Sequence, residues 1–514
     1  MQRRQLLQRL ACTATTGLGL AAATAAPATQ AAAGASTSRP EDFDAAAAQQ
    51  PLLTPLKGVT DTSGHLDGTA MLRGRWPAGL RGRFYRNGPA LFERGGQRYH
   101  HWFDGDGMVQ QFRIGAGAVQ HRGRLVGTVK LRAEQQAGRF LMPTLGTHID
   151  GGPPISGPDA VNPANTNALE HVGRVLAMWE GGSAYGMDPH DLATQGPVVW
   201  RPDAAQLPFS AHPKVDRAGH LWNIGIAGKR LIVWHVDPQG ALARVQLAAL
   251  PFFVGMVHDM AVTERHIVVP LPPVGFDFTQ RPAEGRRRFA MKPDEPLRVL
   301  VMEKTDITRQ RVFELPPEMI FHVGNAHDTH DGEVVLSYVG APDAWFLDEG
   351  AVALLAGRPA VTRNHVQARQ LRLHMPSGRS EVQSFPGEVE FPRVHPQHVG
   401  LPARWLLAAA GWPAHAGRQA SALLHGLLLL DTHTGRARRF DYGADVIAEE
   451  HVIVPKPGKM GELDAWLLGT TFDARRQATV LNLLDAAHIE DGPIAQAVLP
   501  YALPLGFHGN FTAA

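Results

Sequence analysis

Cysteine is almost absent from this chain. The only cysteine among 514 residues is Cys12, and it lies in an N-terminal segment that we expect to be removed. A mature protein without cysteine has no disulfide, no cysteine-ligated zinc, no iron–sulfur cluster and no catalytic thiol. Any metal must therefore be bound by histidine, carboxylate or backbone oxygen.

Long apolar runs and an excess of charge of one sign are also absent. Beyond the N-terminus no apolar run approaches the ~18 residues that a membrane span requires. Charged residues make up 19% of the chain, and the formal net charge is +2. The two signs are mixed along the sequence, which excludes the basic footprint of a nucleic-acid-binding protein. Apolar residues make up 44%, which is enough for a large folded core.

The N-terminus has the pattern of an export signal. Arg3 and Arg4 precede an apolar, alanine-rich stretch with small-residue cleavage sites, as in secretory signals. The arginine pair resembles twin-arginine signals, which bring folded proteins to the Tat export machinery. We predict a signal peptide over residues 1–33, a flexible linker over 34–50 and a periplasmic location. The alternative, a frayed helical tail, explains neither the arginine pair nor the alanines.

Short apolar runs between turn residues predict an all-β fold. The chain contains 54 glycines and 39 prolines, a composition that favours many short strands. We find no clean 40-residue repeat and no boundary after Pro51, so residues 51–514 are predicted to form one sandwich, barrel or propeller domain. The strand-like runs cover residues 123–129, 173–180, 220–227, 229–237, 265–272, 297–304, 332–340, 425–435 and 478–486.

Histidine is frequent, with 25 residues, and four histidines stand out by their surroundings. His212, His258, His322 and His508 each lie beside strand-like apolar sequence and small or turn residues. They are far apart in the sequence, so only a closed fold can bring them together. Taken singly, each has the ordinary interpretation of a hydrogen-bonded loop histidine.

Several segments of the chain, in order, match one known family. They are FYRNGPALF (84–92), HWFDGDGMV (101–109), ANTN (164–167), MWEGGSAYGMDP (178–189), SAHPKVD (210–216), HDMAVTE (258–264), FHVGNAHD (321–328), EFPRV (390–394) and LGFHG (505–509). This ordered set resembles the carotenoid cleavage oxygenase family, which includes lignostilbene dioxygenases and the retinal pigment epithelium isomerase. The match runs from about Pro51 to His508. A single segment such as DGDG is a common turn, but the ordered set is highly specific.

The resemblance implies a seven-bladed β-propeller with a cap of loops and short helices over an Fe²⁺ ion on its axis. Four neutral imidazoles would leave the iron its full +2 charge, with open positions for O2 beside the substrate. The family's metal ligands fall on His212, His258, His322 and His508.

The resemblance also implies supporting residues around the iron. The family uses three glutamates to accept the distal N–H of the ligand rings, and Glu180, Glu390 and Glu450 match them, with Glu449 as an alternative to Glu450. Thr166 falls where some members place a catalytic-site threonine whose methyl group restricts one iron position.

The implied activity is an alkene-cleaving dioxygenase that gives two carbonyl products from a carotenoid or apocarotenoid and O2. Lys130 falls near a lysine that stilbene cleavers place against a phenol oxygen, so a stilbene or phenylpropanoid is the alternative substrate. The alternative interpretation of Lys130 is an exposed strand lysine. Residues 140–145 (FLMPTL) either form a tunnel mouth in peripheral contact with a membrane or pack in the core.

Two alternatives come from other functional classes: a non-catalytic periplasmic propeller that binds a ligand, and an exported zinc hydrolase. A local zinc site could use His322, His327 and His330, although a turn after a strand readily collects such residues. The segment departs from the family at His327 and Asp328, where an aromatic residue and a glutamate are usual. We interpret the remaining candidates as surface or strand-edge residues: His100, His101, His220, His235 and His266.

Overall fold

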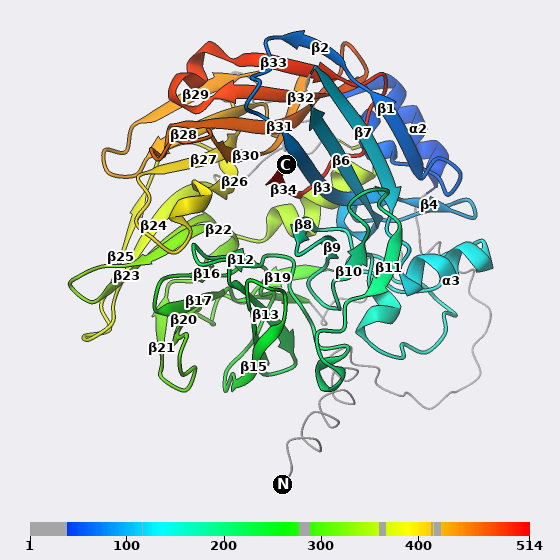
Figure 1. The fold of residues 1–514 in the computed structure, drawn as a ribbon. Coiled ribbons are helices and arrows are strands. Elements are labelled where there is room, and N and C mark those ends of the chain that lie inside the picture. Colours follow the sequence, from blue (N-terminus) through cyan, green and yellow to red (C-terminus); the bar gives the residue numbers. More distant parts are fainter. Residues whose placement is uncertain (1–38, 116, 277–287, 359–365, 413–414, 416–422) are drawn as a thin grey trace, which may run out of the picture.

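The structure is a computed structural model that describes residues 39–115, 117–276, 288–358, 366–412, 415 and 423–514. Within these residues, seven sheets of four or five strands surround one centre (Figure 1). The predicted seven-bladed β-propeller is confirmed. The predicted signal peptide lies outside the described residues.

Five sheets are built from four strands that are nearly consecutive along the chain. In each of these sheets the first strand lies near the propeller axis and the last strand lies at the rim. A hairpin of β18 (Val274–Phe276) and β19 (Phe289–Met291) is inserted in the chain between β17 and β20. The five sheets are made of β8 (Asn167–His171), β9 (Arg174–Met178), β10 (Tyr185–Met187) and β11 (Thr194–Pro197); β12 (Lys214–Val215), β13 (Leu221–Ala227), β14 (Arg230–Val236) and β15 (Leu242–Ala249); β16 (Ala261–Val262), β17 (His266–Leu271), β20 (Leu297–Glu303) and β21 (Gln310–Leu315); β22 (Met319–Asp328), β23 (Glu333–Ala341), β24 (Gln367–His374) and β25 (Ser380–Ser384); and β26 (Val389–Arg393), β27 (Trp405–Ala410), β28 (Gly426–Asp431) and β29 (Ala437–Asp441).

The other two sheets close the ring by pairing strands from opposite ends of the chain. One contains β1 (His65–Thr69), β7 (Ala118–Leu125), β6 (Asp106–Gly115), β3 (Gly82–Leu91) and β34 (His508–Ala513); the other contains β2 (Met71–Gly74), β33 (Pro493–Val498), β32 (Ala478–Asp485), β31 (Ala465–Asp473) and β30 (Val446–Pro455). β34 pairs with β3, and β33 pairs with β2. These pairings protect strand edges that would otherwise be open to other chains.

The middle strands of the blades explain the apolar runs in the sequence. Every residue of β28 is buried, whereas every residue of β25 at the rim is exposed. A middle strand packs against neighbouring blades on both faces, so both faces are apolar. The predicted runs after the first coincide with β9, β13, β14, β17, β20, β23, β28 and β32.

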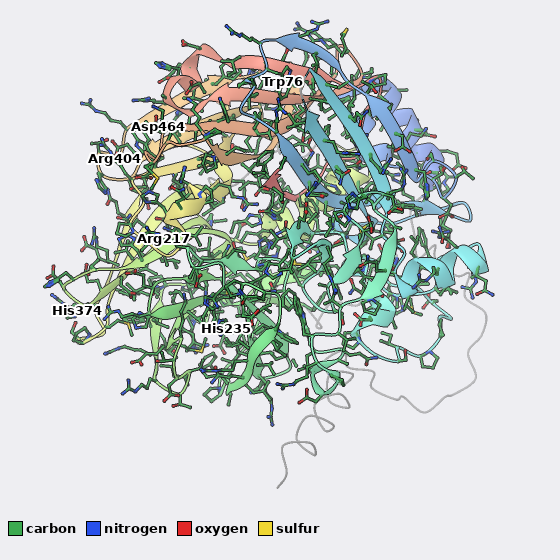
Figure 2. The ribbon with its side chains drawn as sticks, in the orientation of Figure 1. Trp76, Arg217, His235, His374, Arg404 and Asp464 are labelled. Atoms are coloured by element: carbon green, nitrogen blue, oxygen red, sulfur yellow. The ribbon has the colours of Figure 1, made fainter. Side chains whose placement is uncertain are left out.

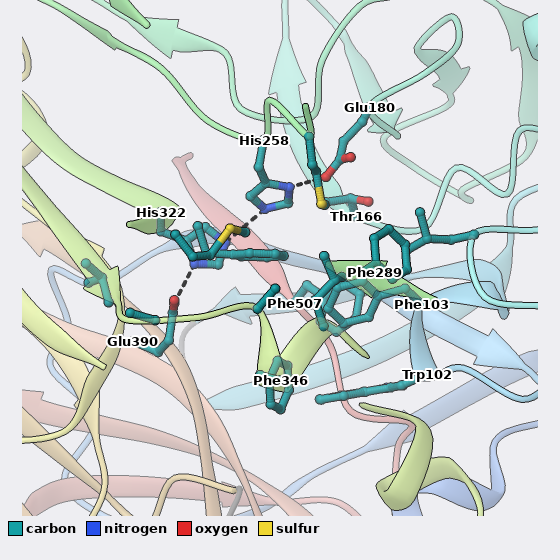
Figure 3. A pocket seen from close by; sticks show the side chains of 18 of the residues that line it. Trp102, Phe103, Thr166, Glu180, His258, Phe289, His322, Phe346, Glu390 and Phe507 are labelled. Atoms are coloured by element: carbon teal, nitrogen blue, oxygen red, sulfur yellow. Dashed lines mark hydrogen bonds and ion pairs between the residues drawn. The ribbon is translucent and has the colours of Figure 1, made fainter. Parts of the chain in front are cut away.

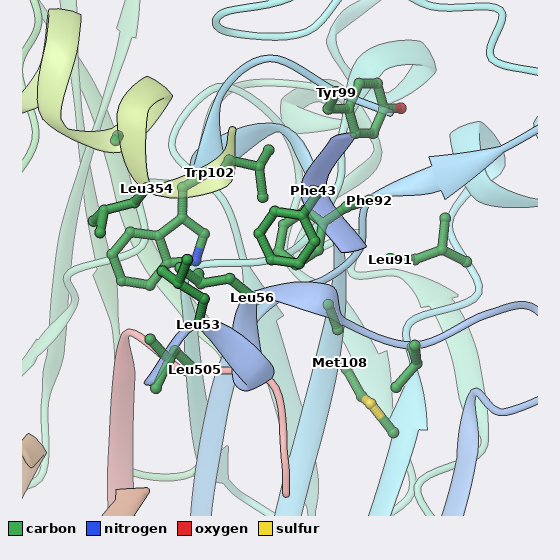
Figure 4. Packing of buried hydrophobic residues seen from close by; sticks show 14 of the residues in the cluster. Phe43, Leu53, Leu56, Leu91, Phe92, Tyr99, Trp102, Met108, Leu354 and Leu505 are labelled. Carbon is green, nitrogen blue, oxygen red and sulfur yellow. The ribbon is translucent and has the colours of Figure 1, made fainter. Parts of the chain in front are cut away.

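The predicted linker differs from the structure over residues 40–49. These residues form the helix α2 (Pro40–Gln49), which is followed by the short helix η1 (Pro51–Lys57). Phe43 of α2 is 1% exposed and lies under the Arg98 guanidinium, 3.8 Å from the ring centroid. Phe43, Leu53 and Leu56 pack beside Trp102 (Figure 4). Burial of one phenylalanine anchors a segment whose composition resembles a linker.

The first predicted strand, residues 123–129, also differs from the structure. β7 ends at Leu125, and α3 (Val129–Ala137) begins after Thr128, whose side chain accepts a hydrogen bond from the Leu131 amide at 3.0 Å. Thr128 is a favourable N-cap, so the helix begins there. Lys130 is therefore neither on a strand nor exposed, because it is fully buried on α3.

Short helices and loops cover one end of the propeller axis. They include η2 (Trp102–Asp104), the π-helical turn η6 (Phe346–Gly350) and α4 (Ala351–Leu355). The cap is the one that the resemblance implies. Polar side chains such as His374 and Arg404 lie instead at the ends of the blades (Figure 2). No helix among the described residues is long and apolar enough to cross a membrane.

Candidate metal centre

The four predicted histidines meet on the propeller axis. His212 and His258 lie just before the innermost strands β12 and β16, His322 lies in β22, and His508 begins β34. Each comes from a different blade, and each is only 4–5% exposed. Their possible ligand atoms all lie within 4.8 Å of one another. Neighbouring Nε2 atoms are 3.0 Å apart for His212 and His258, 3.1 Å for His258 and His322, and 3.0 Å for His322 and His508.

Carboxylates fix the hydrogen on three of the four rings. The Nδ1 atom of His258 contacts Glu180, that of His322 contacts Glu390, and that of His508 lies 2.9 Å from Glu450. Each Nδ1–H donates to a carboxylate oxygen, so each Nε2 is left with a lone pair that points to the centre. The structure therefore brings the three predicted glutamates to the predicted histidines (Figure 3 shows two of these pairs).

The nitrogen separations fit a single metal ion. Lone pairs that converge at 3.0 Å repel one another unless a cation lies between them. Metal–imidazole bonds of about 2.1 Å place two nitrogens about 3.0 Å apart at right angles and about 3.4 Å apart in a tetrahedron. The observed 3.0–3.1 Å matches the right-angle arrangement rather than the tetrahedral one of structural zinc sites. Four buried histidines that can bind a metal are thus present.

Glu450 is the most firmly held of the three glutamates. Arg393 donates to both of its oxygens at 2.8 and 2.9 Å, and the Gly509 amide donates at 2.8 Å. Burial alone would raise the pKa of Glu450, but Arg393 and His508 outweigh it and hold that pKa well below its usual range. Glu449, the alternative from the sequence, contacts Arg86 at 2.6 Å and no ligand histidine.

The fourth ring, His212, has a different neighbour that the sequence did not reveal. The Asp259 carboxylate lies 3.9 Å from His212 Nδ1 and 2.8 Å from Lys214 Nζ. Burial raises the pKa of Asp259, but Lys214 outweighs it, so the carboxylate stays ionised. Asp259 stands directly after His258 in the segment HDMAVTE, and this adjacency was the only signal for it.

Burial keeps two of the four rings, His212 and His508, available to a metal at neutral pH. Burial is the main cause that lowers the pKa of His212 well below its usual range, and the charge of the neighbouring histidines is the second. Burial also lowers the pKa of His508 to about 4. For His322 the same burial is outweighed by Glu390, which raises the pKa. His212 and His508 are therefore neutral at pH 7, the form that binds metal.

An apolar cavity of about 530 Å³ lies under the cap and reaches the histidines. His258, His322 and His508 line it together with Thr166, Leu145 and aromatic side chains. Figure 3 shows the aromatic group: Trp102, Phe103, Phe289, Phe346 and Phe507. The volume lies within the range of about 300–1,000 Å³ that small-molecule sites occupy.

Thr166 stands in the cavity wall next to the metal centre. Its carbonyl accepts a hydrogen bond from the His508 amide at 3.2 Å, and its hydroxyl donates to Asn165 Oδ1 at 3.2 Å. The hydroxyl is occupied by Asn165, which leaves the methyl group as the part that can contact a bound molecule. Its role in restricting a metal position stays a prediction.

The structure gives no support to the local zinc site. The four-histidine group found among the described residues contains His322 but neither His327 nor His330, and the His330 side chain is fully exposed. One other expectation was wrong: His101 is buried at the start of η2, neither on the surface nor at a strand edge. His266 is also buried, but it is the first residue of β17, in line with the strand-edge alternative. His101 Nε2 lies 2.7 Å from the Leu347 carbonyl, a contact that joins η2 to η6 within the cap.

Lys130 does not line the cavity among the described residues. Its Nζ lies 2.9 Å from each of Tyr99 Oη, Asp106 Oδ1 and Glu134 Oε2. Of residues 140–145, Phe140 and Met142 pack in the core and Leu145 lines the cavity. The Lys130 ammonium group is thus paired inside the protein with Asp106 and Glu134.

Known proteins resemble this chain over most of its length. The model of the family described as retinal pigment epithelial membrane protein matches residues 60–513. The chain is 30% identical over 474 residues to apocarotenoid-15,15'-oxygenase of Synechocystis, covering 86% of this chain and 92% of that protein. It is 28% identical over 467 residues to lignostilbene-alpha,beta-dioxygenase isozyme III of Sphingomonas paucimobilis, covering 86% and 93%. A solved structure of a Synechocystis apocarotenoid oxygenase variant superposes with a TM-score of 0.78 at 26% identity, covering 93% and 100%.

Proposed function

The chain belongs to the retinal pigment epithelial membrane protein family of oxygenases, and on that premise we propose that it is an iron(II) dioxygenase that cleaves a carbon–carbon double bond of an apocarotenoid. The products would be two carbonyl compounds, one oxygen atom of O2 going to each carbon of the broken double bond. One observation carries the proposal: four buried histidines converge at the floor of an apolar cavity.

We propose Fe²⁺ as the metal held by His212, His258, His322 and His508. Four neutral rings add no charge, so a bound ion keeps its full +2 charge. The bound iron would supply the activation of O2, chemistry that amino-acid side chains do not provide. The right-angle nitrogen separations of 3.0–3.1 Å support an ion with open positions over tetrahedral zinc, and so disfavour a zinc hydrolase.

The protein's own residues would hold the reactants and exclude water. Glu180, Glu390 and Glu450 keep the Nδ1 hydrogens in place, so that the Nε2 atoms stay unprotonated. The aromatic walls would fix a long apolar substrate with one double bond over the histidines and leave no room for bulk water. We assign to the Thr166 methyl group the restriction of one position on the metal, since its hydroxyl is already bonded to Asn165.

The substrate class follows from the cavity and from Lys130. An extended apolar polyene needs no charged partner in the cavity, whereas a hydroxystilbene would use a lysine against its phenol oxygen. The lysine that the sequence offers for that role, Lys130, is fully buried and paired with Asp106 and Glu134. Lys292 lines the cavity, but its side chain is exposed and its Nζ lies 4.0 Å from the Phe253 ring centroid. We therefore propose an apocarotenoid and not a stilbene as the substrate.

Reconstitution with iron tests the activity. The purified protein is loaded anaerobically with Fe²⁺, and exposed to air with an apocarotenal or with a hydroxystilbene, and aldehyde products are measured. We expect about one iron per chain and aldehydes from the apocarotenal. Iron-loaded protein that cleaves neither substrate would contradict the proposed function.

The ligand assignment has a matched pair of variants. His258→Ala should abolish iron retention, whereas His327→Ala, in the same protein but away from the centre, should not. Equal loss of iron in both variants would point to the local site around His327 instead.

We further propose that the mature protein is periplasmic and is exported folded, with its metal already bound. The support is the Arg3–Arg4 pair and the alanine-rich stretch that follows, and loading before export would avoid competition from zinc and copper, which bind imidazole more tightly. Replacing both arginines by lysine should retain the protein in the cytoplasm, as cell fractionation would show. Unchanged export would contradict a twin-arginine route. Peripheral contact with a membrane stays a prediction.

A further inference from the structure

A second cavity, of about 360 Å³, lies along the propeller axis beyond the four histidines. Its walls come from all seven innermost strands, namely β8, β12, β16, β22, β26, β30 and β34. His212 lines only this axial channel, His258 lines only the apolar cavity, and His322 and His508 line both. The four rings therefore form a layer between two cavities.

The lining of the axial channel has a larger polar share than that of the aromatic cavity. Carboxylate, ammonium, guanidinium, amide and hydroxyl groups line it together with apolar strand residues. The polar lining includes Asn167, Lys214, Asp259, Asn325, Arg393, Glu450, Asn510 and Thr512.

The channel leads from the buried metal centre to the surface. His508 is 4% exposed, Asn510 and Thr512 on the same strand are half-buried, and Pro396 in the lining is exposed. The five strand residues from His508 to Thr512 are separated by four steps, which span about 13 Å. At about 30 Å³ per molecule, the channel holds on the order of ten waters, so an ion inside it can keep part of its hydration shell.

We propose that this axial channel is the route by which the divalent cation enters and leaves the four-histidine site. The proposal rests on the proposed function, because it requires the histidines to bind a metal. The walls of the aromatic cavity are mostly apolar, so an ion that crossed it would lose water with few polar groups to replace it. The axial channel offers oxygen and nitrogen atoms from several of its strands, Asn167, Arg393 and Asn510 among them.

Ion pairs in the channel prevent the cation from being trapped on the way. Asp259 is paired with Lys214 at 2.8 Å, and Glu450 with Arg393 at 2.8 Å. A route must bind an ion well enough to admit it and weakly enough to release it. Carboxylates that are already neutralised meet this condition, whereas free carboxylates would compete with the histidines.

Obstruction at the outer end of the channel tests the route. Thr512→Trp places an indole in the channel, and Ala513→Trp is its matched control, because successive strand residues point to opposite faces and Ala513 is exposed and outside the lining. Uptake of Co²⁺ by apoprotein is followed by its visible absorption, and release is followed with a chelator. We expect Thr512→Trp to slow uptake and release by the same factor, tenfold or more, with the Kd unchanged. Ala513→Trp should match the wild type.

Charge at the same position gives a second measurement that does not depend on the indole. Thr512→Glu should accelerate Co²⁺ uptake and Thr512→Lys should slow it, each by about three- to tenfold at low salt, and added salt should remove both effects. Unchanged rates in the Thr512 variants would overturn the channel as the route. If the wild type bound no Co²⁺, or if His258→Ala bound it equally well, the proposed metal site itself would fail.

Discussion

Replacement of Glu450 by glutamine should weaken metal binding strongly, although the two side chains have the same shape. In the native protein, Glu450 Oε1 accepts hydrogen bonds from His508 Nδ1 and Arg393 Nε, and Oε2 accepts from Arg393 Nη2 and the Gly509 amide. A glutamine has one NH2 group, and in either orientation that group faces two donors. The variant can relieve this conflict by donating to His508 Nδ1, which moves the ring hydrogen to Nε2.

A hydrogen on Nε2 blocks the atom that faces the metal. Loss of an outer partner of a metal-bound histidine lowers metal affinity about 10- to 100-fold, and we expect the upper end, about 2.7 kcal/mol. Arg393, which is 28% exposed, is left without its carboxylate. We therefore also expect the free energy of unfolding to fall by about 3–5 kcal/mol, the effect of breaking a buried ion pair.

Glu390→Gln is the matched control, because Glu390 uses only one oxygen. Its Oε2 accepts from His322 Nδ1 and from the Phe391 amide at 2.5 Å, and in the described part of the chain no donor contacts Oε1. A glutamine can place its carbonyl on His322 and its NH2 towards the cavity, so metal affinity should fall less than tenfold. Titration with Co²⁺ and chemical denaturation measure both effects. Equal losses of affinity in the two variants would refute the donor-counting argument.

Three further predictions concern stability. Lys130→Met leaves Asp106 and Glu134 as buried charges without their cation, and urea unfolding should show a loss of about 3–5 kcal/mol; a loss below about 1 kcal/mol would mean that the cluster is not held as described. Burial lowers the pKa of His121 to about 3, so the folded state excludes a proton that the unfolded state binds below about pH 6.5. The neutral His121 ring therefore costs the folded state nothing above about pH 6.5, and the free energy of unfolding falls as the pH drops towards 3, by about 2.7 kcal/mol at pH 4.5. Urea unfolding at pH 7 and at pH 4.5 should show a smaller difference in the free energy of unfolding for His121→Gln than for the wild type. An equal difference in the two proteins would exclude His121 as the source. Phe43→Ala should cost about 3–5 kcal/mol, whereas a change within error in thermal unfolding would restore the linker interpretation of residues 40–49.

Local sequence was sufficient for the strands and for the choice of histidines. An apolar run such as residues 425–435 is bounded by turn residues and has the length of a strand, so it forms β28 in any propeller or barrel. The histidines were selected because short segments around them match a family in order, and their identities do not depend on knowing the contacts. The three glutamates came from the same match.

Contacts between segments that are distant in the sequence could not be predicted from local sequence. Phe43 is the one bulky side chain in an alanine-rich stretch, and only the position of Arg98 above its ring makes α2 part of the fold. Lys130 follows strand-like sequence, but Thr128 begins a helix and Asp106 and Glu134 bury the charge. In both places a long-range partner overrides the local pattern.

The sequence by itself determined the class of fold and the candidate ligands, since these depend on residue type and local order. Tertiary structure alone decided that His322 and His508, 186 residues apart, lie with Nε2 atoms 3.0 Å from each other. It also decided that Glu450 rather than Glu449 holds His508, and that Asp259 lies beside His212. Closure of seven blades around one axis fixes these distances, and it leaves an apolar cavity and a polar channel on the two sides of the four rings. Such distances are properties of the closed ring, which no single segment contains.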